Sequence, residues 1–224
     1  MRELAIYDMD RTVTRTGTYT PFLIHAARML APWRLALAIF VPFTMAAYAC
    51  KLISRRRLKE WNQRLLLGGA VPRARLRPAV DSFADLICKT NVHPGALRQI
   101  AEDKAAGRRL VLATASYRFY VEAIAAKLGF DDVIATGSIT GLDDIIRARI
   151  DGENNYGPAK LRLIEAWMEA EGIRRADVTV RFYSDHVSDW PALEWADTAI
   201  AVNPSKGLRR MAAKRGWRIV DWGF

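Results

Sequence analysis

Residues 3–12, with the sequence ELAIYDMDRT, decide the fold of this 224-residue chain. The apolar run at residues 4–7 is typical of a strand buried in a parallel sheet. Two carboxylates, Asp8 and Asp10, follow where that strand ends. Because open α/β sheets bind their ligands beyond the carboxyl ends of the strands, this stretch predicts both the class of the sheet and a candidate site at its edge.

Strands and helices alternate along most of the remaining chain. Strands are expected at residues 109–113, 132–136, 178–183, 198–202 and 217–222, and helices at 95–107, 117–128, 160–170 and 205–215, with a hairpin or flap at 140–156. This alternation predicts an α/β fold with a doubly wound parallel sheet.

Residues 16–88 interrupt the alternation directly after the first strand. Their apolar residues recur at helical spacing, and no strand-like alternation appears among them. We therefore expect a core made of residues 1–15 and 89–224, with residues 16–88 inserted as an all-helical cap.

The composition bounds the class of protein. Hydrophobic residues make up 51% and charged residues 26%, which are globular proportions and exclude a disordered chain. The two cysteines, Cys50 and Cys88, exclude a disulfide framework and a cysteine-based zinc site. They favour a reducing compartment, and the start of the chain lacks a signal-peptide pattern, so a cytoplasmic location is expected.

The charge balance is strongly basic. The chain has 34 Lys and Arg against 24 Asp and Glu, a net charge of +10. Such an excess attracts phosphorylated substrates, anionic lipid or nucleic acid, or serves solubility alone.

Further candidate residues lie at comparable places in the predicted sheet. Thr114 and Ala115 close the second apolar strand, where a hydroxyl and free main-chain N–H groups suit a phosphate oxygen. Lys160 begins a helix, and Asp185 and Asp189 follow another strand with oxygens that suit Mg²⁺. Each position alone also fits an ordinary cap, turn or surface lysine. Their common placement at strand ends and helix starts favours one shared site.

This ordered set resembles the motifs of the haloacid dehalogenase (HAD) superfamily over almost the whole chain. Residues 8–12 (DMDRT) resemble the first motif, DxDxT, and Thr114 resembles the second. Lys160 resembles the third motif, and Asp185 with Asp189 the fourth, DxxxD. The insertion after the first motif is similar to the phosphoserine-phosphatase-like subgroup, which carries a helical C1 cap. The resemblance implies a HAD-like (Rossmannoid) fold and a phosphatase.

The resemblance also implies a role for each residue. Asp8 would be the nucleophile and form an aspartyl-phosphate, while Asp10 would protonate the leaving group and then accept a proton from water. Thr114, Ala115 and Lys160 would bind the oxygens of the substrate phosphate.

Charge arithmetic makes a metal ion necessary in this reading. Asp8, Asp185 and Asp189 bring about three negative charges before a phosphate arrives, and Lys160 offsets one of them. Mg²⁺ would offset two more. By resemblance, its ligands are the carboxylates of Asp8 and Asp185, the main-chain carbonyl of Asp10, and Asp189 directly or through water.

The inserted segment suggests the substrate. Phosphoserine phosphatases carry a glutamate shortly after the first motif, whereas residues 13–19 contain no acid, which speaks against an amino-acid substrate. Arg64 could still occupy the place of that family's carboxylate-binding arginine.

Residues 35–50 are uncharged and apolar, and the basic stretch KLISRRR follows at 51–57. This combination suits anionic lipid and is similar to the cap of bacterial phosphatidylglycerophosphatases. The leading hypothesis is therefore a lipid phosphomonoester such as phosphatidylglycerophosphate. The alternative is a small soluble phosphometabolite, with these side chains packed inside the cap. The apolar run is too short for a confident membrane span, so any contact is expected to be peripheral, at the inner face of the membrane.

Two non-catalytic classes fit less of the sequence. The basic helix expected at 205–215 could contact nucleic acid, but no aromatic platform or known motif accompanies it, so nucleic acid is not expected as a partner. A membrane-associated scaffold would need the segment 35–57 but none of the four ordered sites.

Overall fold

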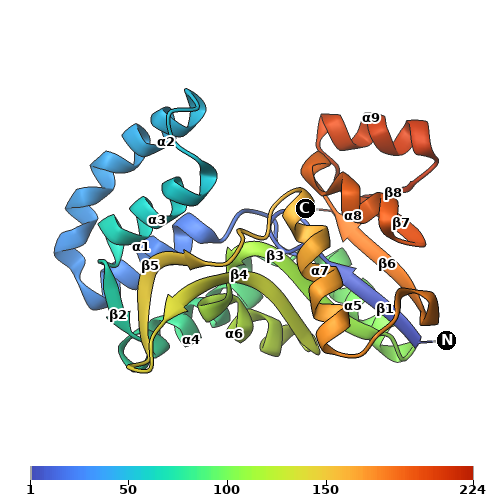
Figure 1. Ribbon diagram of the computed structural model, residues 1–224, viewed down its shortest axis with the longest axis horizontal. Coiled ribbons are helices and arrows are strands. Elements are labelled where there is room, and N and C mark those ends of the chain that lie inside the picture. Colours follow the sequence, from blue (N-terminus) through green and yellow to red (C-terminus); the bar gives the residue numbers. More distant parts are fainter. Residues whose placement is uncertain (1, 224) are drawn as a thin grey trace.

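The computed structural model describes residues 2–223. Its centre is an eight-stranded sheet in the order β2-β5-β4-β3-β1-β6-β7-β8 (Figure 1). The strands are β1 (Arg2–Tyr7), β2 (Ala70–Pro72), β3 (Arg109–Tyr117), β4 (Asp132–Thr140), β5 (Ile145–Asp151), β6 (Val178–Ser184), β7 (Thr198–Val202) and β8 (Arg218–Val220). The run from β4 to β8 is parallel, and β5 and β2 add antiparallel pairs at one edge. The α/β fold class predicted from the sequence is confirmed.

Helices cover both faces of the sheet. They are α1 (Tyr19–Leu30), α2 (Val41–Ala49), α3 (Arg55–Leu66), α4 (Arg73–Thr90), α5 (Pro94–Ala105), α6 (Arg118–Leu128), α7 (Pro158–Ala170), α8 (Trp190–Trp195) and α9 (Lys206–Arg215), with 3₁₀ turns η1 (Pro32–Phe40), η2 (Arg175–Asp177) and η3 (Val187–Asp189). One apolar core joins the sheet to α4, α5 and α6, and a second joins it to α7, α8 and α9.

The strand β1 shows why its sequence is continuously apolar. Ala5 and Tyr7 belong to the first core, whereas Leu4 and Ile6 belong to the second. Successive side chains of a strand point to opposite faces, and all four are at most 1% exposed. A strand covered on both faces therefore needs apolar residues at every position.

Within residues 16–88, the helices α1, α2 and α3 with η1 form the lobe at the left of Figure 1, whereas α4 lies beside α6 below the sheet. The expectation that residues 16–88 are helical throughout is wrong at β2, which pairs antiparallel with β5. Without β2, the outer edge of β5 would leave main-chain N–H and C=O groups without partners. The three residues of β2 pair with this edge. The helix α4 contacts both α1 and α6. The division into a core of 1–15 plus 89–224 and a cap of 16–88 stays a prediction.

Smaller differences from the expected elements have local causes. β3 extends to Tyr117, and its pairing with β4 shifts register between Thr114 and Tyr117, a β-bulge. The expected hairpin at 140–156 is formed by β4 and β5. The short helix α8 was not expected, because a six-residue helix gives too little periodic signal. The last strand covers only Arg218–Val220.

Candidate active site

A cavity of about 520 Å³ lies at the carboxyl ends of β1, β3 and β6. Its walls come from the segment after β1, the start of α1, Arg55 of α3, the start of α7 and the segment after β6. Six of the predicted site residues line it: Asp8, Asp10, Ala115, Lys160, Asp185 and Asp189. Residues up to 181 positions apart in the sequence are thus brought to one place, as expected for an open α/β sheet.

The turn after β1 separates the two acids of the first motif. The amides of Thr12 and Thr14 both donate to the carbonyl of Met9, at 3.3 and 2.9 Å. Arg11 adopts a left-handed conformation with φ of 69°. The chain therefore curls tightly, and Asp8 and Asp10 make contacts with different partners.

Asp8 is held beside the buried ammonium of Lys160. The Nζ atom of Lys160 donates to Asp8 Oδ1 and to Asp189 Oδ2, both at 2.6 Å. Lys160 is only 2% exposed. Burial alone would lower its pKa, but the charges of Asp189 and Asp8 outweigh burial and hold the pKa above its ordinary value. Lys160 therefore remains a cation that can neutralise one carboxylate.

The position of Lys160 follows from local backbone geometry. Gly157 caps α7 with a φ of 62°, in the left-handed region that favours glycine. Its carbonyl accepts from the amide of Lys160 at 2.9 Å, so the helix starts immediately and the lysine lies in its first turn.

Thr12 links Asp8 to Asp185. Its hydroxyl lies 3.0 Å from Asp8 Oδ2 and 3.4 Å from Asp185 Oδ1, and it accepts from the Asp185 amide at 3.0 Å. Two carboxylates on the same hydroxyl must lie close together. Burial raises the pKa of Asp185, and the negative charges of Asp8 and Asp189 raise it further. The pKa of Asp8 is raised as well, chiefly by burial, against the opposing effect of Lys160.

This arrangement fits a hard divalent cation. Carboxylates that crowd together with raised pKa values have too little positive charge beside them. Mg²⁺ would supply that charge, and carboxylate oxygens are ligands that it prefers. Within residues 2–223, no group of three or more acidic, histidine or cysteine side chains already converges as a complete metal site. The predicted set consists of the carboxylates of Asp8 and Asp185, the main-chain carbonyl of Asp10, and Asp189 directly or through water. In this structure Asp189 is engaged by Lys160 and by Ser184, whose hydroxyl donates at 2.8 Å.

Asp10 has a separate set of partners. Its Oδ1 accepts from the amide and the hydroxyl of Thr18 at 2.7 and 2.8 Å, and its Oδ2 accepts from the hydroxyl of Ser116 at 2.7 Å. The Thr18 hydroxyl also lies 3.0 Å from that of Tyr120. Three donors therefore fix this carboxyl at the cavity wall.

Thr114 and Ala115 occupy the bulge at the end of β3. Thr114 is fully buried, and its hydroxyl accepts from the Ser116 amide at 3.1 Å. Ala115 lines the cavity, whereas Thr114 lies behind that wall. We call residues 114–116 the 114–116 bulge.

Arg64 does not reach the cavity. It lies exposed on α3, where its carbonyl accepts from Arg34. Arg55, at the start of the same helix, lines the cavity instead, with its guanidinium 3.8 Å from the ring centroid of Tyr156. The cationic side chain offered by α3 is therefore nine residues earlier than the one selected from the sequence.

Several contributors were not identified from the sequence. Thr18, Arg55 and Ser116 act through contacts between distant segments, for which a single sequence carries no signal. Thr12 could have been identified from the sequence, because it is the threonine of the first motif, DxDxT.

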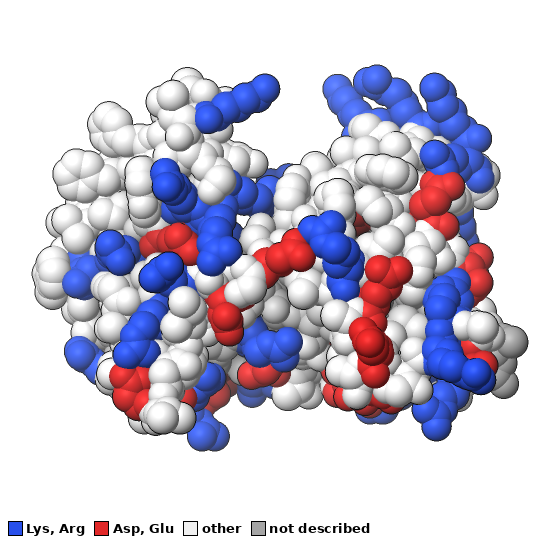
Figure 2. All heavy atoms as spheres, viewed as in Figure 1, with Lys and Arg blue, Asp and Glu red and all other residues white. Residues whose placement is uncertain are grey.

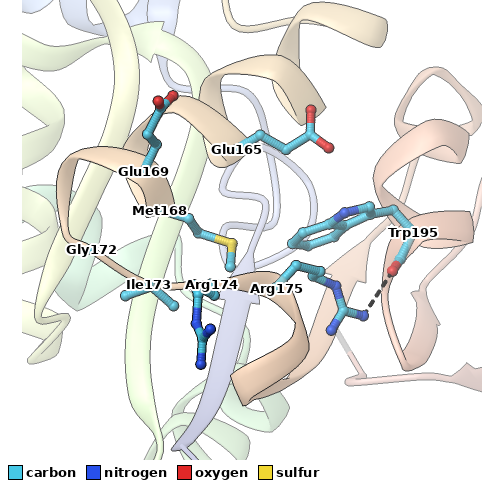
Figure 3. Close-up of a pocket in the computed structure, with 8 residues that line it drawn as sticks. All are labelled: Glu165, Met168, Glu169, Gly172, Ile173, Arg174, Arg175 and Trp195. Carbon is cyan, nitrogen blue, oxygen red and sulfur yellow. Dashed lines mark hydrogen bonds between the residues drawn. The ribbon is translucent and has the colours of Figure 1, made fainter.

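A separate pocket of about 320 Å³ lies beside the end of α7. Figure 3 shows Arg175 bonded to the carbonyl of Trp195, with Glu165 and Glu169 on the helix above. None of the predicted site residues lines this pocket, so it is not part of the site described here.

Comparison with known proteins gives the family. A profile of the haloacid dehalogenase-like hydrolases matches residues 5–194. The chain belongs to this family. The HAD resemblance carried by the motifs is therefore confirmed.

Relatives of this HAD protein include named phosphatases. The inhibition of morphological differentiation protein of Streptomyces azureus is 28% identical over 223 residues, covering 99% of this chain and 79% of that protein. Phosphoserine phosphatase SerB1 of Mycobacterium tuberculosis is 33% identical over 117 residues, covering 52% of this chain and 37% of that protein. The prediction of an enzyme of the phosphatase class is confirmed.

Solved structures show the same fold. A protein with unknown function from Bordetella pertussis Tohama I matches with a TM-score of 0.89 and 26% identity, over 100% of both chains. A phospho-aspartyl intermediate analogue of phosphoserine phosphatase matches with a TM-score of 0.62 and 19% identity, over 99% of this chain and 94% of that chain. The similarity of residues 35–57 to phosphatidylglycerophosphatase caps stays a prediction.

Proposed function

We propose that this HAD protein is a Mg²⁺-dependent phosphomonoesterase that uses Asp8 as its nucleophile. The observation that carries the proposal is the separation of two carboxyls in one cavity. Asp8 lies against Lys160 and close to Asp185, whereas Asp10 is held by Thr18 and Ser116. One acid can attack while the other transfers a proton.

The proposed reaction has two displacements. A carboxylate oxygen of Asp8 attacks phosphorus, the bond from phosphorus to the ester oxygen breaks, and Asp10 gives its proton to the departing alkoxide. Water then attacks the aspartyl-phosphate, Asp10 accepts its proton, and the bond between Asp8 and phosphorus breaks to release inorganic phosphate.

The remaining residues bind the phosphoryl group. Lys160 offers a buried positive charge to the equatorial oxygens, where charge develops in the transition state. The 114–116 bulge is the predicted phosphate-binding segment of β3, where Ala115 lines the cavity, while the Thr114 hydroxyl lies behind the wall and accepts from the Ser116 amide. Mg²⁺, held by Asp8, Asp185 and the Asp10 carbonyl, with Asp189 beside them, would supply positive charge that allows the phosphate dianion to approach Asp8.

The first test measures phosphate release from an aryl phosphate, with and without Mg²⁺, for the parent and for Asp8→Asn. We expect metal-dependent turnover that is almost completely lost in the variant, because an amide is a poor nucleophile for phosphorus. Asp81→Asn, on the exposed side of α4, is the matched control and should keep parental activity. Undiminished turnover by Asp8→Asn would remove Asp8 as the nucleophile.

For the substrate, we propose an anionic lipid phosphomonoester. The exposed apolar side chains of the inserted lobe include Trp33, Ile39 and Phe43, which are 65 to 69% exposed. They lie in Pro32–Ala49, the helical stretch within residues 2–223 that is long and apolar enough to cross a membrane by length and composition alone. Its 18 residues fall short of the roughly 20 that a span needs, which supports peripheral insertion. The exposure also speaks against the alternative in which these side chains pack inside the cap.

Basic groups accompany this apolar surface. On the face shown in Figure 2, white spheres dominate the lobe that contains α2, whereas the blue spheres over α9 lie on the opposite side of the molecule. Lys51, at the end of α2, is exposed. Cations beside exposed apolar side chains match an anionic bilayer, each contributing about 1 kcal/mol near the surface.

A small soluble phosphometabolite is the second candidate, because charged side chains such as Arg55, Lys160 and Asp185 line the cavity. A single comparison separates the two: turnover of phosphatidylglycerophosphate against L-phosphoserine. We expect a preference for the lipid, since residues 17–21 line the cavity without any acid that could pair with an amino group. Arg55 would bind a second anionic group of the substrate. A large preference for phosphoserine would reject the lipid.

A further inference from the structure

A second lysine is buried near the cavity, and the mechanism above does not use it. Lys59 of α3 is 6% exposed, and its Nζ donates to the carbonyl of Ala115 at 2.6 Å and to Asn154 Oδ1 at 2.8 Å. The ammonium also lies 4.2 Å from the ring centroid of Tyr117. The lysine thus joins the inserted helix to the end of β3 and to the loop before α7.

The contact with Ala115 fixes a peptide unit of the 114–116 bulge. The same carbonyl accepts from the Thr136 hydroxyl at 2.8 Å, so two donors from different elements hold it. In a trans peptide the C=O and the following N–H point in opposite directions. Holding the Ala115 carbonyl therefore also orients the Ser116 N–H, which donates to the Thr114 hydroxyl.

The bulge connects this peptide to the proton-transfer residue as well. The hydroxyl of Ser116 donates to Asp10 at 2.7 Å. Through one peptide unit, Lys59 is therefore linked to the Thr114 hydroxyl on one side and to the Asp10 carboxyl on the other.

Burial of this ammonium is unfavourable, which argues that the contact has a purpose. Burial and the nearby charge of Arg55 lower the pKa of Lys59 to about 7, while Asp10 and Glu60 act in the opposite direction. A methionine or leucine would fill the same space without this penalty. The two hydrogen bonds and the aromatic ring of Tyr117 offset part of the penalty.

We propose that Lys59 is a positioning residue that couples the inserted helix α3 to the 114–116 bulge. With α3 docked, the bulge keeps Ala115 at the cavity wall and holds Ser116 where its hydroxyl orients Asp10. If α3 moves away from β3, the Ala115 carbonyl loses one of its two donors and the bulge relaxes. The catalytic effect rests on the proposed function, whereas the effect on the bulge does not.

The test compares Lys59→Met with Arg56→Met. Arg56 is the matched control, because it also ties α3 to main-chain carbonyls, those of Ile150 and Gly152, without touching the bulge. For Lys59→Met we expect kcat on an aryl phosphate to fall about 10- to 100-fold, because small misplacements of reacting groups cause losses of this size. We expect KM to change less than about threefold. Arg56→Met should stay within about threefold of the parent in both constants.

A second readout is independent of turnover. Hydrogen–deuterium exchange of a peptide covering residues 114–118 should speed up in Lys59→Met and remain parental in Arg56→Met. Thr136→Val, which removes the other donor to Ala115, should speed up the same exchange and serves if Lys59→Met fails to fold. The proposal is overturned if exchange in this peptide is parental in either bulge variant, or if Arg56→Met loses as much activity as Lys59→Met. A parent without phosphatase activity would reject the proposed function and leave the exchange test valid.

Discussion

We propose different roles for Asp8 and Asp10, and their surroundings differ accordingly. Asp8 accepts a hydrogen bond from a cation and is buried with other acids, whereas Asp10 accepts from two hydroxyls and an amide. The cation beside Asp8 favours its ionised form, although burial still leaves the pKa of this carboxyl above its ordinary value. Asp10 has no cation among these partners, which fits the separate role that we propose for it.

Asp10→Asn should therefore impair substrates according to their leaving groups. For an alkyl phosphate we expect kcat to fall about 10²- to 10⁴-fold, the usual contribution of a positioned acid. For p-nitrophenyl phosphate the loss should be smaller, because nitrophenolate leaves without a proton. Steady-state kinetics on both substrates, with Asp81→Asn as the control, checks this. Equal losses on the two substrates would show that Asp10 is not the proton donor.

At the scale of elements, η1 and α2 form an unusual surface. Neither element has a buried residue, and Phe40 and Phe43 are both exposed with their rings 6.4 Å apart. Large apolar side chains that stay in water on adjacent turns are characteristic of an interaction surface. Lys51 and Arg57, which follow α2 and are exposed, are the basic residues that support our proposal of an anionic membrane over an apolar protein partner.

Phe43→Ser should weaken binding to anionic vesicles about tenfold, since burying one Phe contributes roughly 1.5–3 kcal/mol. Leu142→Ser is the matched control, because Leu142 is fully exposed but lies in the turn between β4 and β5. Co-sedimentation with phosphatidylglycerol vesicles measures the difference, and phosphatidylcholine vesicles should bind less of either protein. If Phe43→Ser and the parent sediment alike, the lobe does not insert.

At the scale of the whole molecule, the fold places several carboxylates at one edge of the sheet, although the protein has a net charge of +10. Asp8 and Asp185 have raised pKa values, so the folded protein holds protons that the unfolded chain releases. The free energy of unfolding that depends on these two groups is therefore fully present below about pH 4, the ordinary pKa of a carboxyl. It is lost as the pH rises through the raised pKa values of the folded protein. A divalent cation relieves the same repulsion.

Mg²⁺ should therefore stabilise the protein more at pH 7.5 than at pH 4.5, where these acids hold their protons. Saturating metal typically adds about 1–3 kcal/mol, which corresponds to an increase in Tm of roughly 2–10 °C for a chain of this size. Thermal unfolding at both pH values measures this, and Asp185→Asn should reduce the increase. The same increase at pH 4.5 and pH 7.5 would contradict a metal site made of these carboxylates.

The apolar strands and the spacing of the motifs were enough to predict the sheet and to propose the residues of the site. Apolar strands buried on both faces leave a strong signal, and parallel strands place their carboxyl ends at one edge, so Asp8, Lys160 and Asp185 could be brought together without coordinates. Only the tertiary structure showed that Arg55 rather than Arg64 reaches the cavity, that β2 joins the sheet, and that Lys59 bonds to Ala115. These features depend on how the inserted segment packs against the core, and such long-range contacts have no local periodicity for a single sequence to reveal.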